Sequence, residues 1–325
     1  MYVYKLDAQS DSVVDSFYVG TNKEIVGISV STDGRQLWIA DTDINKIVNT
    51  ADMSLLGTIS GVGPVLAFFD PDLDKVVGAA YWRQRILYID PITFTIVDTD
   101  SMRGPSRWWE FVQQPQANCL VGVTFRELQS PDTSAGELRY FDYRQRKTID
   151  SVLIEPSPYG GMQAYFEISP DGSRIFAYGG TPEGLFPWRM YDSHSGAILF
   201  EALQPSYGDN IFLEDNRRLI LTAPGSFTFD NPLTTLQIWD YQSLAMVGNV
   251  DLHWKVDDDS VASLLPAVDG IQIPGTKKLY VSAGTVTGRP GAILVISLEF
   301  MRIEKAIYAG QNGYFRAVAI GPKVP

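Results

Sequence analysis

The sequence predicts an all-β protein built from repeats of four short antiparallel strands, the architecture of a β-propeller. Three observations support this prediction. Apolar segments alternate with turn signals, as in Ile25–Ile59, where Ser31-Thr32-Asp33-Gly34 separates the first two strands. The unit recurs at intervals of roughly 40–60 residues, the length of a propeller blade. The composition, with 28 glycines, 16 tyrosines and 16 phenylalanines, suits a chain rich in turns and strands.

The first repeat defines the elements that the others follow. Its second strand is Leu37–Ala40, its third Lys46–Thr50 and its fourth Leu55–Ile59. Third strands often end in aspartate, before a polar turn into strand four: Asp90, Asp142, Asp192 and Asp240. The repeats span roughly residues 25–60, 65–102, 107–154, 165–203, 209–252 and 268–309.

The two ends of the chain are predicted to complete a seventh blade. Met1–Gly20 matches the third and fourth strands at Ile293–Gly310, and Tyr314–Ile320 matches a first strand. We therefore predict a single domain of residues 1–325, a seven-bladed ring closed by a blade that residues 314–325 and 1–20 share. Closure removes exposed sheet edges. No segment matches the second strand of this blade, so we expect either a three-stranded blade or further residues upstream of Met1.

Composition also restricts the partners. The net charge of −12 argues against nucleic acid, whose binding needs clustered Lys and Arg. The single cysteine, Cys119, excludes an intrachain disulfide and lies in a strand-like run, where a buried structural thiol is expected. No apolar run approaches the ~18 residues of a membrane helix, so no transmembrane segment is predicted.

Several segments match one repeat family. Ser169-Pro170-Asp171-Gly172 matches the S-P-D-G turn of YVTN repeats, Leu279–Ser282 the second strand and Leu87–Asp90 the third. The chain resembles seven-bladed YVTN propellers and the β chains of quinoprotein amine dehydrogenases. Trp239-Asp240 matches the dipeptide of WD repeats, without the Gly-His that accompanies it there. The resemblance implies an exported protein, periplasmic or extracellular, although no signal peptide precedes the first strand.

The candidate binding surface is one face of the predicted ring. In propellers of this kind, loops between strands two and three share a face with connections from strand four to the next strand one. Those loops are long in blades three to six, and long loops on a rigid scaffold often carry function. Aromatic and arginine side chains are enriched in binding sites. The candidates are Trp108, Trp109, Tyr165, Phe186, Tyr207, Phe227, Phe229, Tyr314 and Arg316. The alternative is that these aromatics fill the channel and pack between blades.

A metal site is a second hypothesis. Carboxylates and amides precede several inner strands, and hard cations take oxygen ligands. These residues are Glu24, Glu110, Asp209, Asn210 and Asp269. Gluconolactonase-like propellers hold a divalent ion with such residues, but they have six blades. No other cofactor is evident. Asp257-Asp258-Asp259 lacks the spacing of a calcium loop and is expected to be a solvated acidic loop.

Catalytic motifs are scarce. The two histidines, His194 and His253, are expected to be solvated or to cap turns. The sequence has no Cys-x-x-Cys, His-Glu-x-x-His, Gly-rich phosphate loop or Gly-x-Ser-x-Gly, although a triad with distant members stays open. We interpret the chain as a non-catalytic propeller whose loop face on blades three to six binds a protein partner or small ligand. The alternatives are a lactonase or hydrolase at the channel mouth and an accessory subunit of a redox enzyme.

Overall fold

A computed structural model of the chain contains only strands and turns among the residues that it describes. These are residues 2–20, 25–31, 33–41, 44–70, 72–80, 85–101, 108–114, 119–126, 135–154, 165–178, 188–202, 210–221, 235–257, 260–263, 267–283 and 292–308. No helix in this part of the chain is long and apolar enough to cross a membrane. By its contacts the chain divides into unit 1 (Met1–Gln129, Ala135–Leu153, Ala319–Pro325) and unit 2 (Ser130–Ser134, Ile154–Val318).

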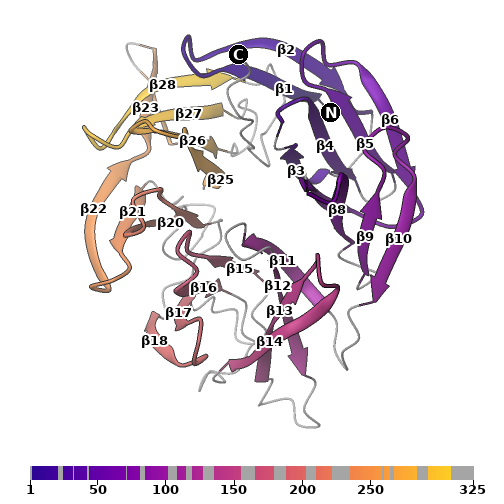
Figure 1. Ribbon diagram of the computed structural model, residues 1–325. Helices are drawn as coiled ribbons and strands as arrows, with labels where there is room; N and C mark the ends of the chain where they lie inside the picture. The colour runs from indigo at the N-terminus through magenta and orange to yellow at the C-terminus, as the bar shows by residue number, and fades with distance from the viewer. Residues whose placement is uncertain are drawn as a thin grey trace. The chain divides into compact units, whose positions relative to one another are not determined.

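Unit 1 contains a hairpin and three four-stranded antiparallel sheets (Figure 1). The hairpin is β1 (Tyr2–Asp7) and β2 (Ser12–Tyr18). The first sheet is β3 (Ile25–Val30), β4 (Gln36–Asp41), β5 (Ile44–Asn49) and β6 (Leu55–Ser60). The second is β7 (Val65–Asp70), β8 (Lys75–Ala80), β9 (Arg85–Ile89) and β10 (Ile96–Ser101). The third is β11 (Trp108–Gln114), β12 (Cys119–Arg126), β13 (Ala135–Asp142) and β14 (Lys147–Ile154).

Unit 2 contains three four-stranded sheets and a separate hairpin. The first sheet is β15 (Tyr165–Ile168), β16 (Arg174–Tyr178), β17 (Trp188–Asp192) and β18 (Ile198–Ala202). The second is β19 (Asn210–Phe212), β20 (Arg218–Leu221), β21 (Thr235–Asp240) and β22 (Ala245–Asp251). The hairpin β23 (His253–Asp257) and β24 (Ser260–Ser263) follows. The last sheet is β25 (Ala267–Gln272), β26 (Lys278–Ala283), β27 (Ala292–Ser297) and β28 (Arg302–Tyr308).

The predicted four-stranded antiparallel units are confirmed, with strands hydrogen-bonded in chain order in every sheet. The described residues hold six such sheets, and the hairpin β1–β2 is the part of the predicted seventh blade that they include. A complete seventh blade and a closed ring are not shown, because the predicted strand Tyr314–Ile320 lies outside the described residues.

One element was not predicted. The hairpin β23–β24 lies between β22 and β25, where the sequence suggested a connection with an acidic loop at Asp257–Asp259 and a histidine beyond strand four. His253 instead begins β23, and Asp257 pairs with Ser260 across the turn. The hairpin has short strands and an all-acidic tip without glycine or proline, so it lacks the usual signal.

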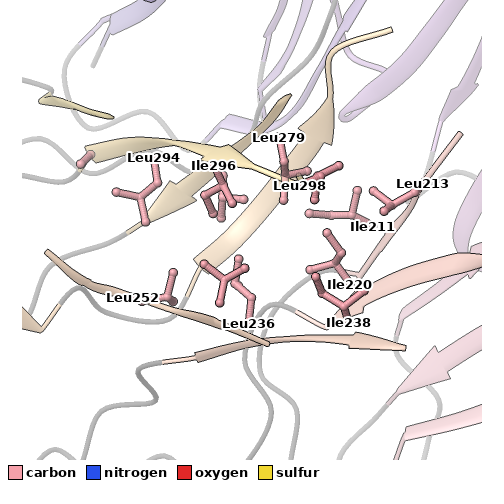
Figure 2. Packing of buried hydrophobic residues seen from close by; sticks show 13 residues of the cluster. Ile211, Leu213, Ile220, Leu236, Ile238, Leu252, Leu279, Leu294, Ile296 and Leu298 are labelled. Atoms are coloured by element: carbon pink, nitrogen blue, oxygen red, sulfur yellow. The ribbon is translucent and has the colours of Figure 1, made fainter. Parts of the chain in front are cut away.

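Neighbouring sheets pack face to face through apolar side chains. In unit 2, β15 lies beside β19 and β19 beside β25, and in unit 1 β3 lies beside β7. Figure 2 shows the cluster between the sheets β19–β22 and β25–β28, built from Ile and Leu side chains such as Ile238, Leu279 and Leu294. Each of these is fully buried, which contributes roughly 1.5–3 kcal/mol per side chain. Apolar clusters of this kind join consecutive sheets within each unit.

The turn between strands three and four has the same structure in successive sheets. The residue that ends strand three, or directly follows it, accepts backbone N–H groups of the turn on its side chain; we call it the cap residue. The Asp90 carboxylate accepts from Ile92 (3.0 Å) and Thr93 (2.8 Å), and that of Asp240 accepts from Gln242 (3.0 Å) and Ser243 (3.0 Å). Asp142 and Asp192 form the same pairs of bonds. The recurrent aspartate seen in the sequence is thus a turn-capping residue.

A left-handed residue lies four positions after each cap, and we call it the latch residue. Phe94, Arg146 and Met301 each contact the sheet before their own. The latch residues have φ between 50° and 71° and are Asp11, Met53, Phe94, Arg146, Gly196, Leu244 and Met301. A left-handed non-glycine residue costs roughly 1–2 kcal/mol, so packing must offset that cost. Phe94 packs on Trp38 of the preceding sheet with ring centroids 6.3 Å apart, and Met301 packs against the cluster of Figure 2.

Strand four begins with a β-bulge. In six hairpins of strands three and four the ladder skips one residue, which we call the bulge residue. These residues are Val14, Leu56, Val97, Leu199, Val247 and Glu304. All six are exposed, and five are aliphatic. A bulge bends an outer strand and so discourages pairing with other edges.

Candidate functional site

The two ends of each sheet carry different connections between strands. The turns between strands one and two and between strands three and four lie at one end, the turn end. The loops between strands two and three and the connections between sheets lie at the other, the loop end. This division follows from the antiparallel order of the strands.

Charged groups at the turn end join neighbouring sheets. Arg144 Nε donates to the buried Asp70 carboxylate at 2.7 Å, and Tyr88 Oη donates to the Tyr143 carbonyl at 2.7 Å. Burial opposes ionisation of Asp70, but hydrogen bonds from Arg144 and from two backbone N–H groups outweigh it and lower its pKa. Burial and the neighbouring Asp70 carboxylate raise the pKa of Tyr143 to about 12. These groups are therefore part of the fold rather than of a reaction centre.

Ser193 and His194 form a Ser–His contact in the turn after β17. Ser193 Oγ lies 3.1 Å from His194 Nδ1. The serine is buried, however, and its hydroxyl donates to the Gly172 carbonyl at 2.6 Å. The Asp192 carboxylate accepts backbone N–H groups of the turn. A nucleophile needs an accessible oxygen and a base oriented by a third group, and this turn provides neither.

At the loop end of unit 1, described polar side chains are used within the fold itself. Asn45, at the start of β5, donates to the Gly63 carbonyl at 2.7 Å and accepts from Val65 N at 2.9 Å. It thereby ties the connection between β6 and β7 to its own sheet. Asp41, the last residue of β4, is fully buried at the same end.

At the loop end of unit 2 a charged pair is buried within a sheet. Arg189 of β17 donates to the carboxylate of Glu201 on β18, and its side chain is only 1% exposed. An arginine this deeply buried is rare without a paired carboxylate. The hairpin β23–β24 also leaves the loop end, because it connects β22, a fourth strand, to β25, a first strand.

The predicted binding residues fall into two groups. Trp108, Trp109 and Tyr165 lie at the beginnings of β11 and β15, which are the loop ends of those strands, as predicted from the repeat. The remaining candidates lie outside the described residues: Phe186, Tyr207, Phe227, Phe229, Tyr314 and Arg316. The structure therefore does not test whether the set converges.

The metal hypothesis is divided in the same way. Glu110, Asn210 and Asp269 lie within the first halves of β11, β19 and β25, again near the loop end. Glu24 and Asp209 lie outside the described residues. Among the described side chains no group of three His, Cys, Asp or Glu residues is arranged to hold a metal ion.

Sequence reasoning missed a site on the outer strand β10 of unit 1, where two carboxylates hold an arginine side chain. Arg146, a latch residue, donates from Nε and Nη2 to the two oxygens of Asp100 at 2.8 and 2.7 Å, and from Nη1 to Asp98 at 2.6 Å. Its guanidinium carbon lies 4.8 Å from the centroid of the Tyr88 ring. These two aspartates hold the pKa of Arg146 above its ordinary value. The constant spacing of cap and latch residues identifies Arg146 as a latch residue, but it does not identify the carboxylates that the guanidinium contacts.

Comparisons with known proteins identify the fold. No protein-family model matches the sequence, and no curated protein matches it. Among solved structures, hydrazine synthase of Kuenenia stuttgartiensis is similar with a TM-score of 0.66 and 14% identity, over 94% of this chain and 92% of that chain. Dihydro-heme d1 dehydrogenase NirN in complex with DHE is similar with a TM-score of 0.56 and 15% identity, over 97% of this chain and 72% of that chain.

The chain is therefore a β-propeller of four-stranded antiparallel blades. At these identities the similarity concerns the fold alone, because propellers carry many unrelated functions. The resemblance to YVTN repeats stays a prediction.

Proposed function

We propose that this chain is a non-catalytic binding propeller that presents the loop ends of its blades to a protein partner. One observation carries the proposal: the two ends of the sheets are used differently. At the turn end, described polar side chains cap turns and join sheets. At the loop end the connections between strands two and three are long in four sheets, at residues 127–134, 179–187, 222–234 and 284–291, and in unit 2 this end also carries the hairpin β23–β24. Rigid scaffolds with long loops on one side are typical of binding proteins.

The test compares the two ends in one binding assay. The tagged full-length chain is purified from its native source, its stoichiometric partner is identified, and the affinity is measured with purified proteins. Trp108→Ala and Tyr165→Ala are expected to weaken binding about tenfold or more, as for aromatic anchors in interfaces. His194→Ala, at the turn end, is the control and should leave the affinity unchanged. Equal effects at both ends, or no effect of the two aromatic substitutions, would refute the proposal.

A second candidate is an accessory subunit of a redox enzyme. It is favoured by the similarity to chains named hydrazine synthase and dihydro-heme d1 dehydrogenase. The sequence has no haem-attachment motif, so a partner would carry the cofactor. The visible absorption spectrum of the complex purified from the native source tests this role. Haem or quinone bands that elute with the chain support it, and a partner without a redox group contradicts it.

The lactonase alternative rests on Glu24, Glu110, Asp209, Asn210 and Asp269, with a divalent cation as their ligand. It predicts lactone turnover that EDTA removes and that Glu24→Gln abolishes. Turnover insensitive to both treatments, or none, excludes it.

We also propose that the blades number seven and that residues 314–325 complete the blade of β1 and β2. One face of this hairpin packs on the first sheet, where Val3 and Phe17 join the cluster of Ile39 and Val48. Tyr2 and Tyr18 lie 5.0 Å apart between ring centroids and are 52% and 50% exposed. Removal of residues 309–325 should lower the midpoint of thermal unfolding and increase the exposure of these tyrosines. An unchanged midpoint would contradict closure.

A further inference from the structure

Two tyrosine side chains stand opposite each other on the hairpin β1–β2. Tyr2 of β1 pairs with Tyr18 of β2 in the register of the hairpin. Residues directly opposite each other on antiparallel strands hold their side chains next to one another. The two ring centroids accordingly lie 5.0 Å apart, with 49° between the ring planes. This separation is only slightly longer than that between two aromatic rings joined by a carbon–carbon bond.

Both rings are accessible to water and to dissolved oxidants, since Tyr2 is 52% exposed and Tyr18 is 50% exposed. An exposed phenol can lose an electron to a one-electron oxidant and its proton to water. The radical that remains shares its unpaired electron with the two ring carbons beside the phenol carbon. Two such radicals that are held next to each other combine through these carbons.

A second ring lies near Tyr2, but its arrangement is less suitable for coupling. Tyr4 follows on the same face of β1, and its ring centroid lies 6.1 Å from that of Tyr2, with 29° between the planes. Stacked rings turn their faces to one another, whereas the new bond must join ring edges. Across the hairpin, Tyr4 is paired with Ser16. The hairpin therefore positions the cross-strand pair for coupling.

We propose that Tyr2 and Tyr18 form a dityrosine cross-link when a one-electron oxidant, a peroxidase with hydrogen peroxide, acts on the chain. Each phenol gives up one electron and one proton, and a bond forms between a Cε carbon of each ring. The hydrogen on each of these carbons then moves to the phenol oxygen, which restores both aromatic rings. One molecule of hydrogen peroxide accepts the two electrons and the two protons and becomes two molecules of water.

The cross-link joins the two strands of the hairpin covalently. The single cysteine can form no disulfide within the chain, so this bond takes the role that a disulfide has in other proteins. It restricts the unfolded chain between residues 2 and 18 and leaves the paired strands in place. The cross-linked chain is therefore expected to unfold at a higher temperature.

The test oxidises the full chain with a peroxidase and hydrogen peroxide, and mass spectrometry then identifies the tryptic peptides. Trypsin cuts after Lys5 and Lys23, so the cross-link joins the peptide that ends at Lys5 to the peptide of residues 6–23, with the loss of two hydrogen atoms. A bond between Tyr2 and Tyr4 would instead stay within the first peptide. At micromolar protein, coupling within a chain should exceed coupling between chains by on the order of a thousandfold, because the effective concentration of linked groups is at least millimolar.

Conservative variants separate this site from general oxidation. Tyr2→Phe and Tyr18→Phe keep the ring and its packing but remove the phenol, so each should abolish the linked peptides. Tyr308→Phe is the matched control, because Tyr308 is also exposed, at 39%, and it should leave the linked peptides unchanged. After the same oxidation, the unmodified chain should unfold a few degrees above Tyr18→Phe.

Several results would overturn the proposal. Covalent dimers as the main product would show that the coupling occurs between chains. Linked peptides that persist in Tyr18→Phe would place the bond elsewhere. Absence of the linked peptides from the oxidised unmodified chain would show that the two rings do not couple, and equal unfolding temperatures of the two oxidised chains would exclude the stabilising role.

Discussion

Gly57 and Gly248 test the latch contact that joins consecutive blades. Both directly follow the bulge residue of a fourth strand, and neither has a left-handed φ. A methyl group on Gly57 would lie 2.3 Å from Cδ2 of Phe94, the latch residue of the next sheet. A methyl group on Gly248 would lie 3.8 Å from Cε of Met301, an ordinary contact distance.

These distances predict that a glycine-to-alanine substitution changes the free energy of unfolding in opposite directions at the two positions. Overpacking costs roughly 1–3 kcal/mol, and the reduced entropy of the unfolded chain offsets roughly 0.4–1 kcal/mol of it. Gly57→Ala should therefore lower the free energy of unfolding by about 1–2 kcal/mol. Gly248→Ala should raise it by about 0.4–1 kcal/mol, because only the entropy term and a favourable contact remain.

Urea unfolding followed by tryptophan fluorescence measures both effects, and Trp38 beside Phe94 reports on the contact directly. A double-mutant cycle with Phe94→Ala isolates the clash: the cost of Gly57→Ala should disappear when the ring is absent. If Gly57→Ala left stability unchanged, or lowered it equally with and without the Phe94 ring, contact with that ring would not be the reason that position 57 is a glycine.

Three further predictions concern the turn end. Tyr88→Phe should lower the free energy of unfolding by roughly 1–3 kcal/mol, because the Tyr88 hydroxyl donates to a buried carbonyl. Tyr241→Phe should be neutral or stabilising, since the buried Tyr241 hydroxyl has no hydrogen-bond partner. Thermal unfolding of both variants distinguishes the two cases. The lowered pKa of Asp70 means that its contribution to stability is present above the unfolded pKa of about 4 and is lost as pH falls through the folded pKa. Asp70→Asn should therefore lower stability at pH 7 by about 2 kcal/mol and flatten its acid dependence in urea titrations; a parallel profile would contradict this. Ser193→Ala should cost about 1 kcal/mol by the same assay, and a cost of zero would show that its bond to Gly172 is dispensable.

The sequence was sufficient for the strands and their order. Alternation of apolar residues and recurrent Asp-Gly or Asp-Asn turns are local signals, so the six sheets could be placed with boundaries close to those observed. The cap aspartates were recognised as a recurrent feature for the same reason. The hairpin β23–β24 was missed because its acidic tip carries no turn signal.

The candidate site was predictable only in part. The placement of Trp108 and Tyr165 at loop ends follows from strand order, which is a property of the chain alone. Whether side chains from different blades meet depends on how sheets pack, and no local pattern encodes that. The arginine site on β10 illustrates the difference: Tyr88, Asp100 and Arg146 come from separate strands and turns.

The sequence by itself determined a β-propeller of four-stranded antiparallel blades, because strand period, turn chemistry and repeat length all act over a few residues. Only the tertiary structure decided what the repeated positions do. From the sequence alone, a left-handed latch residue is recognised only as part of a turn. In the packed structure, Phe94 requires a glycine on the neighbouring strand and Arg146 requires carboxylates there. The physical reason is that these requirements arise from contacts between blades, whose partners lie dozens of residues apart in the chain.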